Sequence, residues 1–190
     1  MKKNDVNFNN YSRFLRQRND YSIFGWCVYL DESKQVADRI ECIEYILHPS
    51  FPNPIRRISD RLTCFSLQSE GWGTFLLNIN IIYKDSSEKK TSYSLKLEED
   101  DWPKPPILYD FSDSKMKAVY DVLIDKNYEW RKLSTIVRKT NLSESTVVKI
   151  LNEFSQKDAV RKAYFLSIDK QEMWGATSVV GLLPKACYEI

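Results

Sequence analysis

Hydrophobic and polar residues alternate with a period of two through the first half of the chain, from Phe24 to Leu97. The alternation is clearest in residues 75–83, where every second side chain is large and apolar. This pattern is typical of β-strands that bury one face. We expect strands at residues 24–30, 40–47, 62–67, 75–83 and 92–97.

The segments between these strands are rich in turn-forming residues, namely LDESK, SFPNP, QSEGWG and KDSSEKK. No helical period interrupts the series, so the pattern predicts an antiparallel β-sandwich. Ile40 has the opposite parity to Ile43 and Tyr45 in the same predicted strand. This change of parity predicts a β-bulge between them.

Residues 98–106, EEDDWPKPP, end the β pattern because prolines and clustered acids are incompatible with a continuing sheet. We therefore expect a β-sandwich over residues 20–98 and a linker over residues 99–111. Residues 1–19 form a basic N-terminal arm. Its segment RFLRQR is expected to be solvated or, alternatively, to pair as an edge strand.

Beyond the linker the hydrophobic period becomes helical, and helices are expected at residues 112–125, 131–140 and 141–157. Ser143 is the expected N-cap of the third helix. The apolar stripes of the three helices contain Met116, Val119, Tyr120, Leu123, Leu133, Ile136, Val137, Val147, Ile150, Leu151 and Phe154. Two strands are expected to follow around the turn DKQE, at residues 159–168 and 172–180.

Composition limits the classes of function. The 190 residues carry 28 Lys and Arg against 26 Asp and Glu, so charge alone does not indicate nucleic-acid binding. A hydrophobic content of 43% is enough for packed cores and excludes a disordered chain. The sequence has no long apolar run and no signal-peptide core. We therefore expect no membrane partner and a cytoplasmic or nucleoid-associated location.

The cysteines and the histidine do not predict a metal or a catalytic centre. The four cysteines show no CxxC spacing, and His48 is the only histidine, so neither a zinc site nor a cofactor is expected. His48 has no acid beside it in a triad-like arrangement, and Ser50 is the only nearby nucleophile. We therefore expect that the protein is not an enzyme.

The second half of the chain has the element order of a winged helix-turn-helix, and LSTIVRKTNLSESTVVKILNEFSQKDAVRKAYF resembles that family. We assign residues 112–190 to this domain. The resemblance implies that the helix after Ser143 enters the DNA major groove. The expected DNA contacts are Ser143, Ser145, Thr146, Lys149 and Asn152 on the helix, with Arg161 and Lys162 on the wing. Glu144 and Glu153 cancel the positive charge of the helix, so contact with a partner protein stays open.

The segment YILHPSFPNPIRR, followed by EGWGTFLLNINIIY, resembles the YEATS domain, with the prokaryotic branch as the nearer match. Trp26 in the first core strand and a closing strand that ends in LKL belong to the same resemblance. The family fold is an immunoglobulin-like β-sandwich, in agreement with the period of two. YEATS domains in eukaryotes read acetylated or crotonylated lysine and catalyse no reaction.

The resemblance implies a slot between the loops LHPSF and GWGTF. Phe51 and Trp72 would face each other across a flat acyl-amide, and the N–H of Trp72 would donate to the acyl carbonyl. Ser50 would bond the ligand amide, and His48 would fix the Ser50 hydroxyl. The remaining residues of the implied site are Gly71, Gly73 and Phe75. The two glycines would let the loop backbone approach the ligand closely, and Phe75 would close the far wall of the slot. A further aromatic of the eukaryotic readers aligns with Ser22, and Tyr21 or Phe24 could replace it.

We thus expect a mainly β protein with a smaller α+β domain, in which a YEATS-like sandwich is joined to a winged helix. The expected function is that of a reader or adaptor. Its sandwich would bind an acylated lysine on a protein, or a similar flat amide ligand, and its winged helix would contact DNA or a partner protein. The alternatives are a protein scaffold in a bacterial defence or signalling complex with a vestigial slot, and a DNA-binding regulator with a structural sandwich.

Overall fold

The structure, a computed structural model, describes residues 6–97, 101–104, 111–125 and 127–184. The chain divides into two compact units, with Met1–Trp102 and Leu183–Ile190 in the first and Pro103–Leu182 in the second. In the described part of the chain, no helix is both long enough and apolar enough to cross a membrane.

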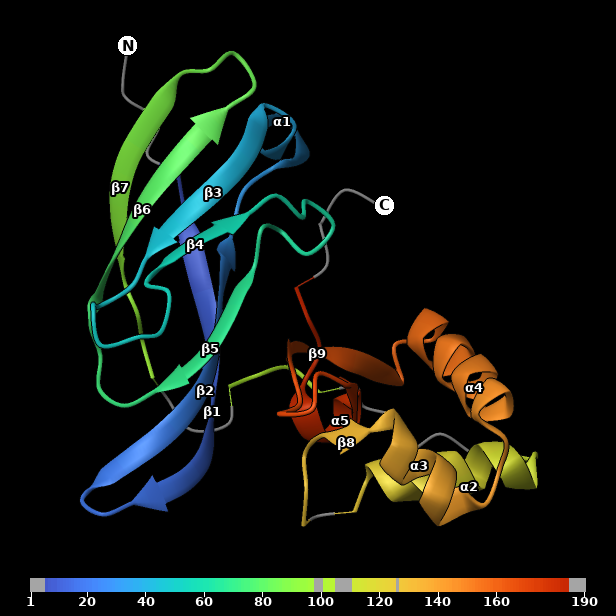
Figure 1. Cartoon of the computed structure of the whole chain (residues 1–190). Coiled ribbons are helices and arrows are strands. Elements are labelled where there is room, and N and C mark those ends of the chain that lie inside the picture. The colour runs from blue at the N-terminus through green and yellow to red at the C-terminus, as the bar shows by residue number, and fades with distance from the viewer. Residues whose placement is uncertain (1–5, 98–100, 105–110, 126, 185–190) are drawn as a thin grey trace. The chain divides into compact units, whose positions relative to one another are not determined.

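The first unit consists of two antiparallel sheets (Figure 1). One sheet has the order β1-β2-β5, and its strands are Phe8–Arg18, Tyr21–Leu30 and Leu67–Gly71. The other has the order β4-β3-β6-β7, and its strands are Ile55–Ile58, Ile40–Ile46, Leu76–Tyr83 and Glu88–Ser94. A short helix, α1 (Lys34–Ala37), connects β2 to β3.

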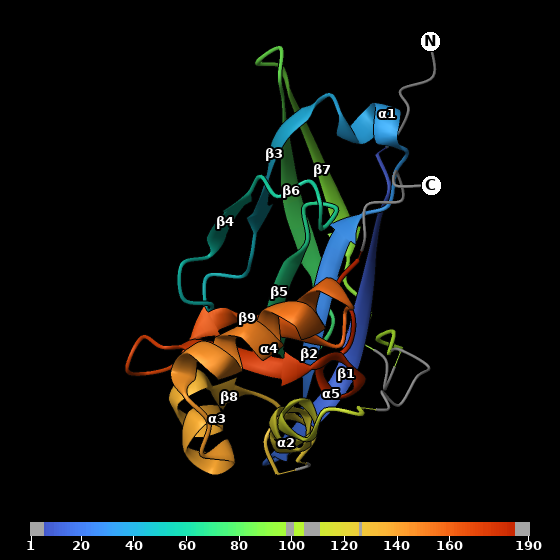
Figure 2. The same cartoon turned by 90° about the vertical axis from the view of Figure 1, so that its right-hand side faces the viewer.

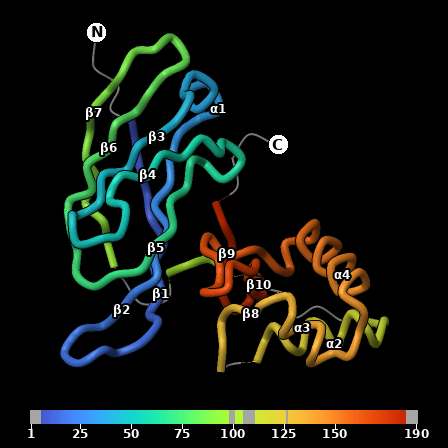
Figure 3. Tube along the Cα trace, in the orientation of Figure 1, coloured from blue at the N-terminus to red at the C-terminus, as the bar shows by residue number. Residues whose placement is uncertain are grey.

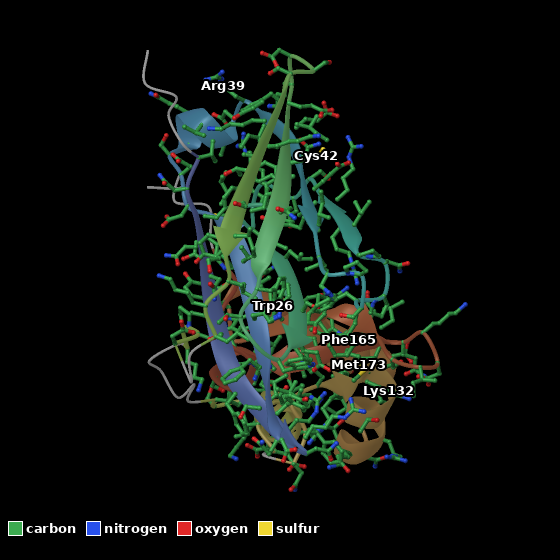
Figure 4. The ribbon with its side chains drawn as sticks, turned by 90° about the vertical axis from the view of Figure 1, so that its left-hand side faces the viewer. Trp26, Arg39, Cys42, Lys132, Phe165 and Met173 are labelled. Atoms are coloured by element: carbon green, nitrogen blue, oxygen red, sulfur yellow. The ribbon has the colours of Figure 1, made fainter. Side chains whose placement is uncertain are left out.

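The core of the first unit lies between the two sheets, which confirms the expected sandwich. Trp26 and Val28 of β2 pack in the same cluster as Tyr45 of β3 and Leu77 and Ile79 of β6. Figure 4 shows Trp26 inside this unit. The predicted bulge is also present, because the β3–β6 register shifts directly after Ile40.

The expected separate arm over residues 1–19 is wrong for residues 8–18. These residues form an edge strand of the sandwich, as the alternative interpretation of RFLRQR predicted. β1 pairs with β2 from Phe8↔Leu30 to Arg18↔Tyr21. Asn10 adds bonds beyond this pairing, since its side chain donates to the Lys96 carbonyl over 2.6 Å and accepts from the Tyr93 hydroxyl. The buried Asn10 therefore joins β1 to β7 and to Lys96, which follows β7.

Two residues of the expected linker belong to the first unit. Trp102 is buried, and its backbone N–H donates to the Ser12 carbonyl. The guanidinium of Arg13 lies 5.6 Å from the centre of the Trp102 ring. Asp101 accepts a hydrogen bond from the Ser12 N–H. The linker therefore cannot begin before residue 103; residues 98–100 and 105–110 lie outside the described part of the chain.

The expected strand at residues 62–67 is wrong, because a tight turn occupies most of it. The Asp60 carboxylate accepts from the N–H of Leu62, and the Asp60 carbonyl accepts from the N–H of Phe65. Cys64 and Phe65 have φ angles of 54° and 52°, a left-handed conformation that a strand cannot contain. The strand β5 therefore begins only at Leu67.

Two further strand predictions differ from the structure. The expected loop after His48 is shorter than supposed, because residues 55–58 form β4 and pair with β3. β7 begins at Glu88, inside the expected turn, and ends before Leu95. Both strands carry charged residues, which obscure the alternation of apolar residues in the sequence.

The second unit contains the three expected helices and a β-hairpin (Figure 2). The helices are α2 (Ser114–Leu123), α3 (Leu133–Thr140) and α4 (Glu144–Gln156). The hairpin is β9 (Val160–Leu166) and β10 (Glu172–Ala176), and the two-residue strand β8 (Arg131–Lys132) pairs with β10. Residues 177–180, expected as strand, form the short helix α5 (Thr177–Val180).

The helix ends follow from capping. The Asp113 carboxylate accepts from the N–H groups of Lys115 and Met116 at the start of α2, and the Ser143 hydroxyl accepts from Thr146 N–H at the start of α4. The predicted N-cap at Ser143 is therefore confirmed. The buried residues that the helices contribute to the core are Val119, Tyr120, Leu123, Ile136, Val147, Ile150, Leu151 and Phe154.

Candidate ligand-binding site

The loop between β3 and β4 is closed by its own backbone and by an arginine. Leu47 N–H donates to the Pro54 carbonyl over 2.8 Å, and Phe51 N–H donates to the His48 carbonyl over 2.9 Å. The guanidinium of Arg56 donates to the carbonyls of Pro52 and Asn53. The loop therefore presents residues 48–51 on a defined backbone.

His48 orients Ser50, as the resemblance implied. Nδ1 of His48 lies 2.9 Å from the Ser50 hydroxyl oxygen and 3.2 Å from the Ser50 backbone nitrogen. Because the backbone N–H donates to Nδ1, this nitrogen is an acceptor, and the hydroxyl also donates to it. The lone pairs of the Ser50 oxygen then remain for a ligand N–H. In the part of the chain that the structure describes, no carboxylate bonds His48, so nothing assigns it a catalytic role.

Phe51 and Phe75 pack against Trp26 and form what we call the inner cluster. The ring centres of Phe51 and Phe75 are 5.8 Å apart. The ring centre of Trp26 lies 6.5 Å from that of Phe51 and 6.1 Å from that of Phe75, and both contacts of Trp26 are edge-to-face. Trp26 is 0% exposed, whereas the two phenylalanines are partly exposed. Nε1 of Trp26 is buried without a hydrogen-bond partner. The sequence placed Trp26 in the core but did not indicate this unpaired donor.

Gly71 allows the backbone of β5 to lie against the inner cluster. A Cβ atom on Gly71 would lie 3.3 Å from Cζ of Phe51 and 3.7 Å from Nε1 of Trp26. β5 ends at Gly71, and Trp72 lies in the bend that follows it.

Trp72 stacks on Tyr21, and we call these two residues the outer pair. Their ring centres are 4.5 Å apart at an interplanar angle of 33°. Both are displayed, with 60% of Trp72 and 50% of Tyr21 exposed. The β2–β5 register explains the contact, because Gly71, the last residue of β5, lies opposite Phe24, and the chain beyond it continues toward the end of β2 at which Tyr21 lies.

The predicted site residues thus form two groups in this structure. His48, Ser50 and Phe51 lie on one loop, Phe51 contacts Phe75, and Gly71 adjoins Phe51. Trp72 belongs to the outer pair, and within the described residues it makes no ring contact with Phe51. The predicted facing arrangement of Phe51 and Trp72 therefore stays a prediction, as does the role of each residue in binding.

The residues predicted to contact DNA are only partly available. On α4, Ser143, Ser145, Lys149 and Asn152 are exposed, and Thr146 is partly buried. Ser143 is engaged as the N-cap, and its hydroxyl lies 2.7 Å from that of Thr146. The exposed residues therefore offer one lysine among neutral groups.

Arg161 is not placed to reach a phosphate, which corrects the prediction for the wing. Arg161 is only 8% exposed. Its guanidinium donates to the Gly181 carbonyl over 2.7 Å and to the Val180 carbonyl over 2.8 Å, and it stacks on the ring of Trp130. Alternation along β9 turns it inward while Lys162 points outward. Lys162 is exposed but forms an ion pair with Glu172 over 2.6 Å.

Residues 24–96 match the family described as the prokaryotic YEATS domain. The chain is 35% identical over 66 residues to transcription initiation factor TFIID subunit 14 of Schizosaccharomyces pombe, and 31% identical over 67 residues to the protein AF-9 homolog of Kluyveromyces lactis. These alignments cover 35% and 34% of this chain, and 27% and 30% of the relatives. The chain therefore spans less than a third of the length of these curated proteins.

Solved structures of the Yaf9 YEATS domain are also similar. The domain recognizing an H3K122suc peptide aligns with a TM-score of 0.40 and 20% identity over 47% of this chain and 70% of that chain. The domain bound to H3K27ac aligns with a TM-score of 0.39 and 17% identity over 50% and 76%. Residues 24–96 of this chain, which match the prokaryotic YEATS domain, therefore lie within a unit made of two antiparallel sheets.

Proposed function

We propose that the first unit is a non-enzymatic reader that binds an acylated lysine, or a similar flat amide, beside the inner cluster. The observation that carries this proposal is the Ser50 hydroxyl, which His48 orients at 2.9 Å next to the partly exposed ring of Phe51. A fixed acceptor beside an aromatic surface suits an amide N–H followed by a flat acyl group. The match of residues 24–96 to the prokaryotic YEATS domain supports the same ligand class.

The chemistry favours a neutral ligand. A free lysine ammonium loses hydration when it enters an aromatic site, whereas an acylated lysine carries no charge. Stacking of a flat group on an aromatic ring contributes about 0.5–1.5 kcal/mol beyond the area buried. One or two such contacts and two hydrogen bonds predict weak binding, at micromolar concentration or above.

Titration of acetyl-lysine and crotonyl-lysine peptides, followed by tryptophan fluorescence, tests the reader function. Ser50→Ala is expected to weaken binding about 2- to 10-fold, since one hydrogen bond is lost. Ser59→Ala is the matched control, because Ser59 is exposed and lies outside the site. The unmodified lysine peptide should not bind. Absence of any response of the unaltered protein at millimolar acyl-lysine would rule the reader function out.

We also propose that the second unit, Pro103–Leu182, contains the winged helix expected over residues 112–190 and contacts DNA or a partner protein. The order α2, β8, α3, α4 and the β9–β10 hairpin supports this assignment. A cytoplasmic or nucleoid-associated location is part of the same proposal. If α4 contacts DNA, Lys149→Ala should weaken retention of a labelled duplex, and Lys115→Ala on α2 should not.

The hairpin favours a protein partner, as in the alternative of a scaffold. Four apolar side chains along it are exposed, and Ile168 at its tip is 103% exposed. The full set is Tyr164, Phe165, Leu166 and Ile168. Phosphate-binding wings depend on cations, whereas exposed apolar side chains of this number are typical of protein contacts. Duplex retention that is the same with and without Lys149 would favour the scaffold.

A further inference from the structure

The four-stranded sheet of the first unit ends in β4 on one side and in β7 on the other (Figure 3). An edge strand presents backbone N–H and C=O groups with which another chain can pair, unless the protein covers or blunts the edge. In the other sheet, the edge strand β1 is covered. Its Ser12 N–H donates to the Asp101 carboxylate, and the Ser12 carbonyl accepts from the Trp102 N–H. The edge at β4 has no such cover.

The register of β4 with β3 shows which backbone groups face the free edge. The bond from Leu47 N–H to the Pro54 carbonyl marks these two residues as a hydrogen-bonded pair, and the β3–β4 ladder continues from it. In an antiparallel ladder every second residue bonds the neighbouring strand. Arg56 therefore bonds β3, whereas the N–H and C=O groups of Ile55 and Arg57 point to the free edge. Within the described part of the chain, none of these groups has a hydrogen-bond partner.

The side chains along this edge are apolar and cationic. Ile55 is 62% exposed, and Ile46, which lies opposite it on β3, is 40% exposed. The Arg57 guanidinium lies 3.7 Å from the Glu44 carboxylate, which is longer than a hydrogen bond. Arg56 donates to backbone carbonyls of the preceding loop, and no carboxylate among the described residues pairs with it. The edge therefore keeps a positive charge beside an exposed apolar surface.

The opposite edge of the same sheet lacks the apolar surface. The bond from Tyr83 N–H to the Ser87 carbonyl determines which residues of β7 face outward, and these include Glu88, Lys90 and Ser92. Charged side chains on an edge strand discourage pairing with another chain. Of the two edges, β4 is therefore the one that suits an extended apolar segment.

We propose that β4 binds an extended segment of a partner protein, which joins the sheet as an antiparallel strand. The backbone of the segment bonds the free N–H and C=O groups of Ile55 and Arg57. The residue opposite Arg57 is acidic, and the residue opposite Ile55, two positions later in the segment, is apolar, because such cross-strand pairs stabilise a sheet. This surface goes beyond the reader function, since it recognises backbone and sequence and not an acyl group.

A second copy of this chain suits the edge less well than an acidic segment does. β4 is only four residues long. If two copies paired symmetrically through both Ile55 and Arg57, Arg56 would lie opposite the same arginine of the second copy. Like charges directly opposite each other destabilise a sheet. The charge of the edge therefore favours a different protein.

Hydrogen exchange of the backbone amides, followed by NMR on the whole chain, tests whether the edge is open. The N–H groups of Ile55 and Arg57 should exchange quickly, and that of Arg56, which bonds β3, should exchange slowly. Slow exchange of Ile55 and Arg57 at every protein concentration would show a covered edge and would overturn the inference. Protection that grows with protein concentration would identify a second copy as the occupant and would overturn it as well.

The binding probe is a short fluorescein-labelled peptide in which a valine follows a glutamate by two positions and threonines fill the other positions. Fluorescence anisotropy should show binding, and bound peptide should slow the exchange of the Ile55 and Arg57 amides. A peptide with lysine in place of the glutamate should bind several-fold more weakly. Absence of binding at millimolar peptide, or binding that leaves both amides unprotected, overturns the inference.

Two variants of one residue separate the side chain from the backbone. Arg57→Ala removes the charge and should weaken binding about 2- to 5-fold. Arg57→Pro also removes the N–H at the free edge and should weaken binding about 2- to 10-fold further. Lys90→Pro, on the free edge of β7, is the matched control and should bind like the unaltered protein. Urea denaturation checks that both proline variants fold, as expected where the lost N–H bonds no strand. Equal binding by Arg57→Pro and Arg57→Ala overturns the inference.

Discussion

The two glycines that flank Trp72 differ in what a methyl group would do. Gly73 has a φ of +73° and open space around it, so Gly73→Ala should cost about 1 kcal/mol of unfolding free energy through the backbone alone. At Gly71 the new Cβ would lie 3.3 Å from the Phe51 ring, which must shift. Gly71→Ala should therefore weaken ligand binding several-fold with a smaller loss of stability. Urea denaturation and peptide titration of both variants separate the effects; equal stability losses would contradict this reading.

At the same scale, the sequence predicted the contacts that are local along the chain. His48 and Ser50 are two residues apart, so their hydrogen bond depends only on the loop between them. The aromatic partner of Trp72 could not be predicted from local spacing. It depends on the register between β2 and β5, which are about forty residues apart in the sequence. Tyr21 was named only as one of two possible replacements for an aromatic at Ser22.

At the scale of elements, adjacent residues of β9 have opposite roles, and this predicts opposite effects on stability. Arg161→Ala leaves the buried carbonyls of Val180 and Gly181 without their donor and should cost about 2–3 kcal/mol. Lys162→Ala removes an exposed ion pair and should cost about 0.5 kcal/mol or less. Thermal denaturation measures both. A loss for Lys162→Ala as large as that for Arg161→Ala would contradict the assigned burial.

The turn between β9 and β10 predicts a pH dependence. The ammonium of Lys132, at 2.8 Å, and the Ser167 hydroxyl lower the pKa of Asp169 to about 2. A carboxyl whose pKa falls on folding stabilises the fold above its unfolded pKa, and the contribution is lost as pH falls through the folded pKa. Asp169→Asn should therefore lower the melting temperature slightly at pH 7, with the difference shrinking below about pH 4 and vanishing only below the folded pKa of about 2. A difference that persists unchanged at about pH 1 would show that the stabilisation does not come from the ionised carboxylate.

The helices were predicted more accurately than the strands, for reasons that the structure shows. Asp113 and Ser143 carry visible N-cap chemistry, and the buried stripe of α4 follows the helical period. The predicted strand at residues 62–67 failed because two residues without special sequence signals, Cys64 and Phe65, adopt positive φ. Such a conformation follows from the hydrogen bonds of Asp60 and from burial, which the alternation of residues does not record.

At the scale of the molecule, the period of two predicted the sandwich but not its limits. β1 joins it through the pairing with β2 and through the bonds of Asn10 to residues more than eighty positions away. Trp102 joins it by burial against Arg13 and Tyr11, although it stands in a proline-rich segment. Both are contacts between distant parts of the chain, so composition and local pattern carried no sign of them.

The distribution of charge over the whole molecule predicts how salt affects any binding to DNA. The net charge is +2, and many lysines of the second unit are engaged with acids. These lysines are Lys117, Lys132, Lys139, Lys157 and Lys162. Because each neutralised phosphate contributes about 0.9 to the slope of log K against log salt, we expect a slope of magnitude about 3 or less.

Fluorescence anisotropy of a labelled duplex between 50 and 200 mM salt, roughly the range over which such slopes are resolved, measures this quantity. Lys149→Ala should reduce the slope by about 1, because Lys149 is exposed on α4 and no ion pair of it is found among the described residues. Lys162→Ala, which removes a lysine already paired with Glu172, should leave the slope nearly unchanged. A slope of log K against log salt of magnitude about 6 or more would mean that the lysines leave their acidic partners to bind phosphates. The wing would then be a phosphate-binding surface.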